Sequence, residues 1–171
     1  LSRAYLGVES GSDQVLRFIH KGCTAEQMLL AGQRLVEAGI DLWVTVILGM
    51  TGANGEGGDW EEHILSTAKM INAMKPRHLS AMTFAPAKGT PLGEDVLAGR
   101  FEVCSADHVL EECRLLLEHL DVDPLHFTSN HASNYLPLKG GLPEDKTKFL
   151  EMIDQALAGK IRLRKTLNRG I

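Results

Sequence analysis

Three short apolar runs, each followed by a polar or glycine-rich segment and then a helical pattern, constrain the fold more than any other feature of the sequence. The runs are Leu1–Val8, Leu42–Leu48 and His78–Phe84. The second is rich in apolar and β-branched residues, which predicts a strand buried on both faces, as parallel sheets require. Strands that alternate with helices across short turns are typical of βαβ units. We therefore predict an α/β fold with parallel strands.

Helix-capping signals mark the segments between and after these runs. Ser12 is expected to cap a short helix, and Thr24 opens a capping-box pattern before a helix that ends at Gly39. Asp59 starts the next helix, which runs through Met74. Farther along, the sequence predicts a helix from about Ser105 to Leu120, a short strand at His126–Thr128, a polar segment at Ser129–Lys139 and a final helix from Pro143 to Leu157.

The composition excludes several classes of protein. Hydrophobic residues make up 44% of the 171 residues and charged residues 23%, as in soluble globular domains. The net charge of −4 argues against a nucleic-acid surface, and the basic segment Lys160–Arg169 is interpreted as a solvated tail. No run approaches the ~18 apolar residues of a membrane span. The cysteines Cys23, Cys104 and Cys113 are odd in number and widely spaced, so we expect no disulfide framework and a cytoplasmic setting.

The segments that follow the three runs have the residues expected of a ligand site. They are Glu9–Ser12, Gly49–Gly58 and Ala85–Thr90. Ligands of parallel α/β sheets bind at the carboxyl ends of the strands, where these loops lie. Glu9 and Ser10 provide a carboxylate and a hydroxyl, and Gly11 is expected to let the backbone approach a ligand. Each loop alone could be a plain connector, and the glycine-rich loop lacks the Lys-Ser/Thr pair of a P-loop.

The same segments carry the motifs of one superfamily. Tyr5–Leu16 (YLGVESGSDQVL) is similar to a strand segment written G-x-E-S-G-s-d-x-x-L. Ala38–Ile40 followed by Val46–Met50 resembles A-G-(I/F)…x-I-x-G-x-P-G-E-T, and Ala85–Leu92 (APAKGTPL) resembles p-x-x-G-T-p-L. These are the fourth, fifth and sixth strand segments of radical S-adenosylmethionine (SAM) proteins, in the broad group of methylthiotransferases and relatives of coproporphyrinogen dehydrogenase.

The resemblance implies a particular fold and activity. The fold would be a partial TIM-like barrel, the carboxy-terminal portion of the radical SAM (β/α)6 barrel with a helical tail. Residues 1–100 would contain strands four to six, and residues 101–171 would form helices and a polar loop that pack on the barrel. The chain would be a fragment of an enzyme that cleaves SAM reductively with a 4Fe-4S cluster, starting radical chemistry on an unknown substrate.

The resemblance also assigns roles in SAM binding. The residues concerned are Glu9, Ser10, Ile47, Gly49, Phe84, Ala85 and Pro86. Glu9, with Ser10 beside it, would hydrogen-bond the ribose or the amino-acid part of SAM, because a carboxylate accepts from hydroxyls and pairs with an ammonium. Ile47 would pack against the adenine, which Gly49 would allow to approach. Backbone groups around Phe84 would meet the adenine edge.

Two departures separate the chain from the family pattern. The cluster-binding motif C-x-x-x-C-x-x-C occurs nowhere in the sequence, so we expect no cluster in this chain, no metal site and no catalysis by this chain alone. The first residue, Leu1, already lies in an apolar run, which indicates a fragment without its cluster-binding segment. The proline and acid of G-x-P-G-E-T are missing after Gly49, and Glu56 comes too late to replace the acid.

The polar segment before the last helix is a candidate for substrate contact. Its candidate residues are Asn130, His131, Asn134 and Tyr135. The segment is expected either to close over the mouth of the barrel or to be a turn-rich connector held by Asn and Ser side chains.

Two other functions remain open from the sequence. One is a non-catalytic scaffold or interaction domain on a partial barrel, which would self-associate through the strand edge before Tyr5 because open edges pair readily. The other is a phosphate-binding α/β barrel enzyme that uses the glycine-rich loop at Gly55–Gly58, although no basic residue lies there.

Overall fold

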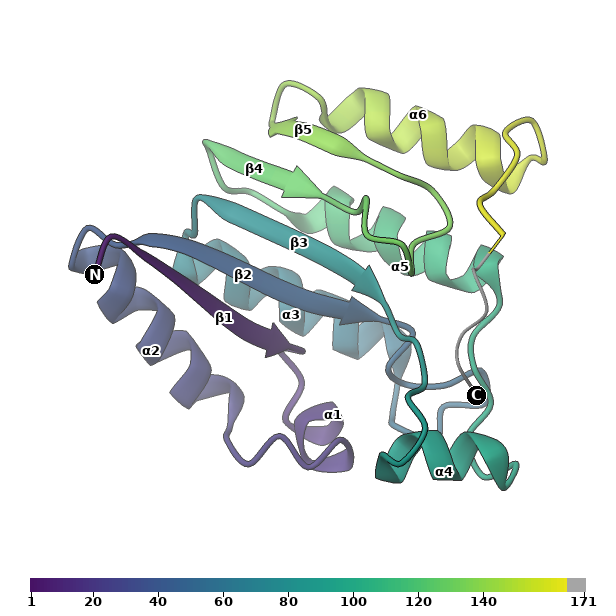
Figure 1. The fold of residues 1–171 in the computed structure, drawn as a ribbon. Helices are drawn as coiled ribbons and strands as arrows, with labels where there is room; N and C mark the ends of the chain where they lie inside the picture. The colour runs from purple at the N-terminus through teal and green to yellow at the C-terminus, as the bar shows by residue number, and fades with distance from the viewer. Residues whose placement is uncertain (166–171) are drawn as a thin grey trace.

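A five-stranded sheet forms the centre of the fold (Figure 1). The structure, a computed structural model, describes residues 1–165, so the end of the basic segment, 166–169, lies outside the described residues. The strands are β1 (Arg3–Glu9), β2 (Asp41–Leu48), β3 (His78–Thr83), β4 (Leu125–Thr128) and β5 (Lys139–Leu142). They follow one another in chain order, and the first four are parallel, as predicted. Strand β5 pairs antiparallel with β4 and was not expected.

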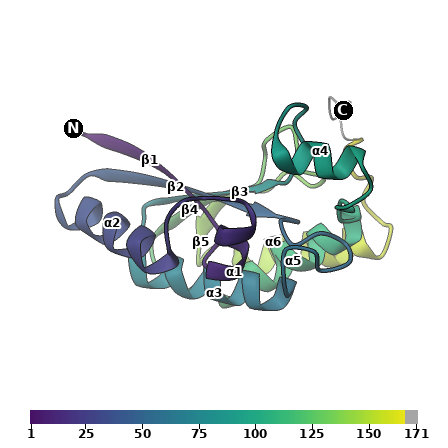
Figure 2. The same ribbon diagram turned by 90° about the horizontal axis from the view of Figure 1, so that it is seen from below.

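The helices are α1 (Asp13–Phe18), α2 (Ala25–Glu37), α3 (Trp60–Met74), α4 (Pro91–Leu97), α5 (Ala106–His119) and α6 (Lys146–Leu157). Figure 2 shows α2, α3, α5 and α6 on one face of the sheet, with α4 beyond the carboxyl ends of the strands and toward the other side. The second face therefore has no helix along its strands within residues 1–165. None of the described helices combines the length and the apolar character that a membrane span needs.

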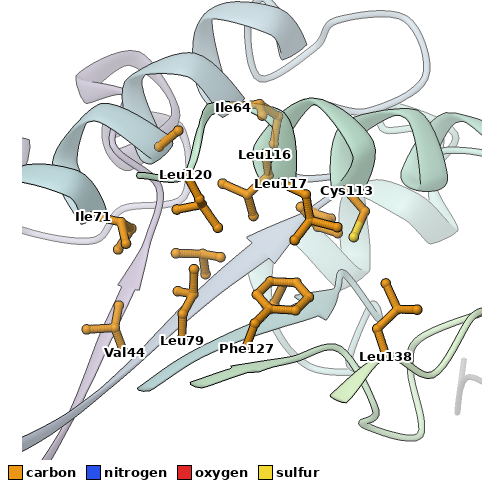
Figure 3. Close-up of a cluster of buried hydrophobic side chains, with 14 of the residues drawn as sticks. Val44, Ile64, Ile71, Leu79, Cys113, Leu116, Leu117, Leu120, Phe127 and Leu138 are labelled. Carbon is orange, nitrogen blue, oxygen red and sulfur yellow. The ribbon is translucent and has the colours of Figure 1, made fainter. Parts of the chain in front are cut away.

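The hydrophobic core lies between the sheet and the helices. In Figure 3, Val44, Leu79 and Phe127 of the sheet face Ile71 of α3 and Leu117 of α5. All five are at most 1% exposed. Burying one such side chain stabilises the fold by roughly 1.5–3 kcal/mol.

Strand β2 is covered on one face only. Its residues alternate between buried and half-buried, and Trp43, Thr45 and Ile47 form the half-buried set. The prediction that this strand is buried on both faces is therefore wrong. The second face is open because α2, α3 and α5 lie on the same side of the sheet, whereas α4 lies beyond the strand ends.

The predicted capping residues lie where expected, with one difference in how they act. Thr24 forms the complete capping box of α2, the Asp59 side chain accepts from the backbone N–H of Glu62 at the start of α3, and Gly39 follows α2 at φ 71°. Ser12 occupies the N-cap of α1, but its side chain makes no capping hydrogen bond. The backbone N–H of Ser12 instead donates to the hydroxyl of Ser10, at 2.9 Å.

Two segments expected to be irregular contain regular elements. Helix α4, which was not predicted, follows the Ala85–Thr90 loop directly, and the side chain of Thr90 at its N-cap accepts from Gly93 N–H. The last helix begins at Lys146, later than predicted, after a turn at 143–145 that follows β5. Pro143 consequently lies in the turn between β5 and α6 and not inside the helix.

Gly11 permits a close approach between backbones, but not the approach to a ligand that was expected. Its N–H donates to Thr67 Oγ1 of α3 at 2.8 Å. A Cβ added at Gly11 would overlap the backbone carbonyl of Ser66 in the same helix. Because a helix backbone cannot yield as a flexible side chain can, Gly11 fixes the turn after β1 against α3.

We predict that Gly11→Ala lowers the free energy of unfolding by about 1–3 kcal/mol, because the added methyl overpacks a rigid contact. Urea denaturation measures this difference. Gly141→Ala is the matched control: a Cβ there would lie 3.6 Å from Glu144 Oε2, an ordinary contact. The control is expected to change stability by no more than about 0.5 kcal/mol. Equal effects of the two substitutions would contradict the role given to Gly11.

Candidate functional site

The carboxyl ends of the first three strands lie side by side. Glu9, at the end of β1, is in register with Val46 of β2. Beyond the end of β3, the N–H of Phe84 donates to the carbonyl of Leu48 at 2.8 Å. The loops that follow β1, β2 and β3 therefore start from one edge of the sheet, where parallel α/β proteins bind ligands.

Glu9 has an unusual backbone conformation and an unsatisfied carboxylate oxygen. Its φ is 63°, in the left-handed region, and the register between β1 and β2 shifts between Gly7 and Glu9. Oε1 accepts from Lys21 Nζ at 3.1 Å, whereas Oε2 is buried and has no hydrogen-bond partner among the described residues. A non-glycine residue in this conformation costs of order 1–3 kcal/mol, and such strain is concentrated at functional sites. Glu9 thus offers one free acceptor to a ligand.

Ser10 is buried in the protein interior. It is 0% exposed, and its hydroxyl lies 2.7 Å from Nδ1 of His63 in α3, a residue that no sequence motif indicated. The other ring nitrogen, Nε2, lies 3.1 Å from the carbonyl of Ile47. Because a carbonyl only accepts, Nε2 carries the proton and Nδ1 accepts from Ser10. His63 therefore joins the ends of β1 and β2.

Burial lowers the pKa of His63, although the negative charge of Glu112 and the Ile47 carbonyl act in the opposite direction. The imidazole is accordingly held neutral in the interior. This is the protonation state that the hydrogen bonds to Ser10 and Ile47 require.

The glycine-rich loop after β2 is held by its own carboxylate. Glu56 Oε1 accepts from the backbone N–H of Glu102 at 2.9 Å, and Oε2 accepts from that of Asn54 at 3.2 Å. Burial would raise the pKa of Glu56, but the hydrogen bond from the Glu102 backbone and others in the loop bring it below the ordinary value. The Glu56 carboxylate thus occupies the backbone N–H groups that a bound phosphate would need. This arrangement disfavours phosphate binding by the loop.

The other residues assigned to SAM differ in exposure. Ile47 and Phe84 are half-buried, Ala85 is exposed, and Gly49 and Pro86 are buried. The Cα of Gly49 faces α5, since a Cβ there would touch Val109. Ile47 therefore belongs to the open face of the sheet, whereas Gly49 packs toward the core.

A hollow of about 380 Å³ lies on the open face of the sheet. Asn130 and His131 line it, but Glu9 and Ile47 do not. Asn134, expected beside them, is buried and donates from Nδ2 to the Ala81 carbonyl at 3.0 Å. Tyr135 is half-buried and packs against the core. The four candidate substrate residues therefore divide between the hollow and the interior.

A row of rings crosses the open face and was missed by sequence reasoning. The ring of Trp43 stacks on that of His78, with centroids 4.0 Å apart and planes at 15°, and Tyr5 lies on its other side at 5.7 Å. Asp41 accepts from Trp43 Nε1 at 3.1 Å and from Arg3 Nε at 2.8 Å. The signal was the placement of Asp41 and Trp43 two residues apart in β2, which puts both on one face.

Together, the parallel strands, the helices on one face and the loops gathered at the carboxyl edge define an α/β protein whose sheet forms part of a barrel wall. Neither a protein-family model nor a curated protein matches the sequence. Across 95% of its length, the chain superposes on a solved structure of Elp3 from the archaeon Methanocaldococcus infernus, with an N-terminal deletion of residues 1–46. The TM-score is 0.59 and the sequence identity is 18%.

This likeness confirms the predicted fold class, an α/β fold that corresponds to part of a larger barrel protein. The chain spans 37% of the Elp3 chain. At 18% identity the likeness shows a similar fold and assigns no role to individual residues.

We predict that the hydrogen bonds of His63 make the stability depend on pH. Its pKa is lower in the folded protein than the 6.5 of an ordinary histidine, so the unfolded chain binds the proton more readily. The contribution of His63 is therefore complete above pH 6.5 and is lost as the pH falls toward the folded pKa.

Urea denaturation of the wild type and of His63→Gln between about pH 7.5 and 5.5 tests this. The stability advantage of the wild type is expected to shrink as the pH falls. Comparing the two proteins removes the contributions of His78 and His108, which both share. An advantage that stays constant over this range would show that His63 is not held neutral.

Proposed function

We propose that the chain forms the carboxy-terminal part of a radical SAM enzyme, and that the edge formed by the ends of β1, β2 and β3 holds part of SAM. The motifs in Tyr5–Leu16 and Ala85–Leu92 support this assignment. So does the likeness in fold to Elp3, a member of the radical SAM superfamily. The observation that carries the proposal is Glu9, a strained residue with a buried, unpartnered oxygen at the end of β1.

The residues at this edge fit SAM in part. Glu9 Oε2 would accept from a ribose hydroxyl or from the ammonium of the methionine part, because a carboxylate binds both groups well. Ile47 and Phe84 are half-exposed apolar side chains of the kind that contacts an adenine ring. Ser10 does not fit a direct contact, since its hydroxyl already bonds His63 and the Ser12 backbone. We therefore assign Ser10 to positioning Glu9.

The cysteines of the chain do not fit a 4Fe-4S cluster. Cys104 and Cys113 are buried, and Cys23 is half-buried before α2. Cys104 and Cys113 are nine residues apart and Cys23 is far from both, so their spacing is not that of the C-x-x-x-C-x-x-C motif. A cluster and the electron it supplies would come from residues outside this chain. Bound SAM would supply the adenosyl group from which the radical reaction starts, and the substrate of that reaction is not specified by these residues.

We predict that the chain binds SAM and 5′-deoxyadenosine, and that Glu9→Gln weakens SAM binding by about ten-fold. The estimate corresponds to one lost charge-assisted hydrogen bond, worth roughly 1.5 kcal/mol. Isothermal titration calorimetry measures both affinities. Glu37→Gln, which removes the same charge from an exposed position on α2, is the control and is expected to bind as the wild type does.

Comparing SAM with 5′-deoxyadenosine distinguishes the two groups that Glu9 could bind. If Glu9 pairs with the ammonium, the substitution weakens SAM and leaves 5′-deoxyadenosine unchanged; if it binds the ribose, both ligands weaken. The absence of any heat with either ligand would refute binding by this edge. Failure of a longer protein that contains this chain and a C-x-x-x-C-x-x-C motif to cleave SAM, under reducing and anaerobic conditions, would overturn the class.

One observation favours the scaffold function as a second candidate. Strand β1 is at the edge of the sheet, and its Tyr5 is 72% exposed, with Leu1 before it at 93%. An edge strand presents unpaired backbone groups to another chain, and exposed apolar side chains strengthen such pairing.

We accordingly predict that the chain self-associates through β1 and that Tyr5→Lys reduces this association, because a lysine on an edge strand opposes pairing. Sedimentation equilibrium over a range of concentrations measures the effect. Leu97→Lys, which places the same charge on an exposed apolar position in α4, serves as the control. A wild type that remains monomeric at high concentration would rule out the edge as an interface.

A further inference from the structure

Three potential metal ligands of different chemical types lie together at the start of α5. Cys104, His108 and Glu112 are four residues apart, so they share one face of the helix and the turn before it. One donor atom from each residue, the thiol sulfur, a ring nitrogen and a carboxylate oxygen, can be chosen so that all lie within 4.8 Å of one another. The group includes none of the residues assigned to SAM, although Glu112 and Cys104 both contact one of them, Gly49, at the end of β2.

Two buried atoms of this group, one on Glu112 and one on His108, have few polar contacts. Glu112 is 0% exposed, and its Oε2 accepts from the backbone N–H of Gly49 at 2.6 Å. Its second oxygen, Oε1, lies 3.2 Å from Nε2 of His108. Apart from this contact with each other, neither Oε1 nor Nε2 has a polar partner among the described residues. An unsatisfied carboxylate oxygen in the interior is costly unless a cation lies beside it.

The separation of these two atoms matches that of two ligands on one metal ion. Nitrogen and oxygen ligands about 2.0–2.1 Å from a tetrahedral zinc ion lie about 3.3 Å apart. Nε2 and Oε1 are 3.2 Å apart. The sulfur of Cys104, which lies within 4.8 Å of a donor atom of each of the other two residues, would supply a third corner. Its present contact, to the carbonyl of Gly49 at 3.9 Å, is weak.

We propose that Cys104, His108 and Glu112 form a binding site for a divalent transition metal ion, with zinc as the best match. Thiolate, imidazole and carboxylate are the three ligand types that zinc takes in proteins. A thiolate and a carboxylate together neutralise the two charges of the ion, which suits a buried site. On binding, the Cys104 thiol releases its proton to solvent and a zinc–sulfur bond forms, so no electron is transferred.

The surroundings orient two of the proposed ligands. The N–H of Gly49 holds the Glu112 carboxylate through Oε2 and leaves Oε1 for the metal. The ring of Trp60, the first residue of α3, contacts that of His108 edge-on, with centroids 5.2 Å apart and planes at 67°. Such outer contacts fix the orientation of metal ligands and tune their affinity. The side chain of His108 is 23% exposed, so its side of the site gives an ion access and leaves room for a water as fourth ligand.

Occupation of the site would tie α5 to the end of β2. Gly49 begins the glycine-rich loop, and both its N–H and its carbonyl already contact the group. A metal ion would therefore stabilise the strand end from which this loop starts. This consequence holds whether or not the chain binds SAM.

Cobalt(II) and zinc added to the reduced chain test the proposal. Cobalt is expected to bind in one equivalent and to give the intense near-ultraviolet absorption of a cobalt–thiolate bond, with visible bands of a tetrahedral site. Zinc is expected to displace it and to raise the melting temperature. Cys104→Ser should abolish the thiolate absorption, and His108→Gln should weaken cobalt binding by at least about ten-fold.

Cys113→Ser is the matched control, since Cys113 is a second buried thiol on the same helix but outside the group. It should bind cobalt as the wild type does. Circular dichroism verifies that each variant is folded, and the partly exposed His108 keeps the test valid if Cys104→Ser unfolds. The proposal is overturned if the wild type shows no thiolate absorption, if His108→Gln binds with unchanged affinity, or if Cys113→Ser loses the absorption instead.

Discussion

The end of β2 is the point on which the rest of the structure depends. This strand lies between β1 and β3, and one of its faces is fully covered by helices. Two buried polar contacts hold its last residues: His63 of α3 bonds the Ile47 carbonyl, and Glu112 of α5 bonds the Gly49 N–H. Because both contacts are shielded from water, breaking either would leave an unsatisfied polar group in the interior. The helices thus fix the position of the strand end as well as covering it.

The conformation of Glu9 follows from the same arrangement. Its neighbour Ser10 is drawn into the interior by His63, and Val8 on its other side is 0% exposed. The Ser10 N–H donates to the Val8 carbonyl at 2.8 Å, which closes a tight turn with Glu9 at its centre, at φ 63°, where the register between β1 and β2 shifts. The carboxylate then remains at the edge of the sheet, held on one oxygen by Lys21. The strained conformation of Glu9 is therefore held within a turn whose flanking residues, Val8 and Ser10, are both buried.

Local signals in the sequence predicted much of this fold and less of the site. The caps at Thr24 and Asp59 and the order of the first three strands depend on neighbouring residues, so short patterns were enough. Strand β5 is rich in glycine, and only its pairing with β4 makes it a strand. The burial of Ser10 depends on His63, 53 residues farther along the chain. A partner at that distance leaves no pattern in a single sequence.

The charges gathered at the carboxyl edge favour one kind of ligand over another. Glu9 ends β1, Glu56 lies in the loop after β2, and Glu112 contacts the first residue of that loop. Lys21 pairs with Glu9, the ring of His108 lies 3.2 Å from the Glu112 carboxylate, and amide groups hold Glu56. Such an edge repels a phosphate, which disfavours the phosphate-binding alternative. It attracts groups that carry positive charge, and SAM, with its sulfonium and its ammonium, is a cofactor of that kind.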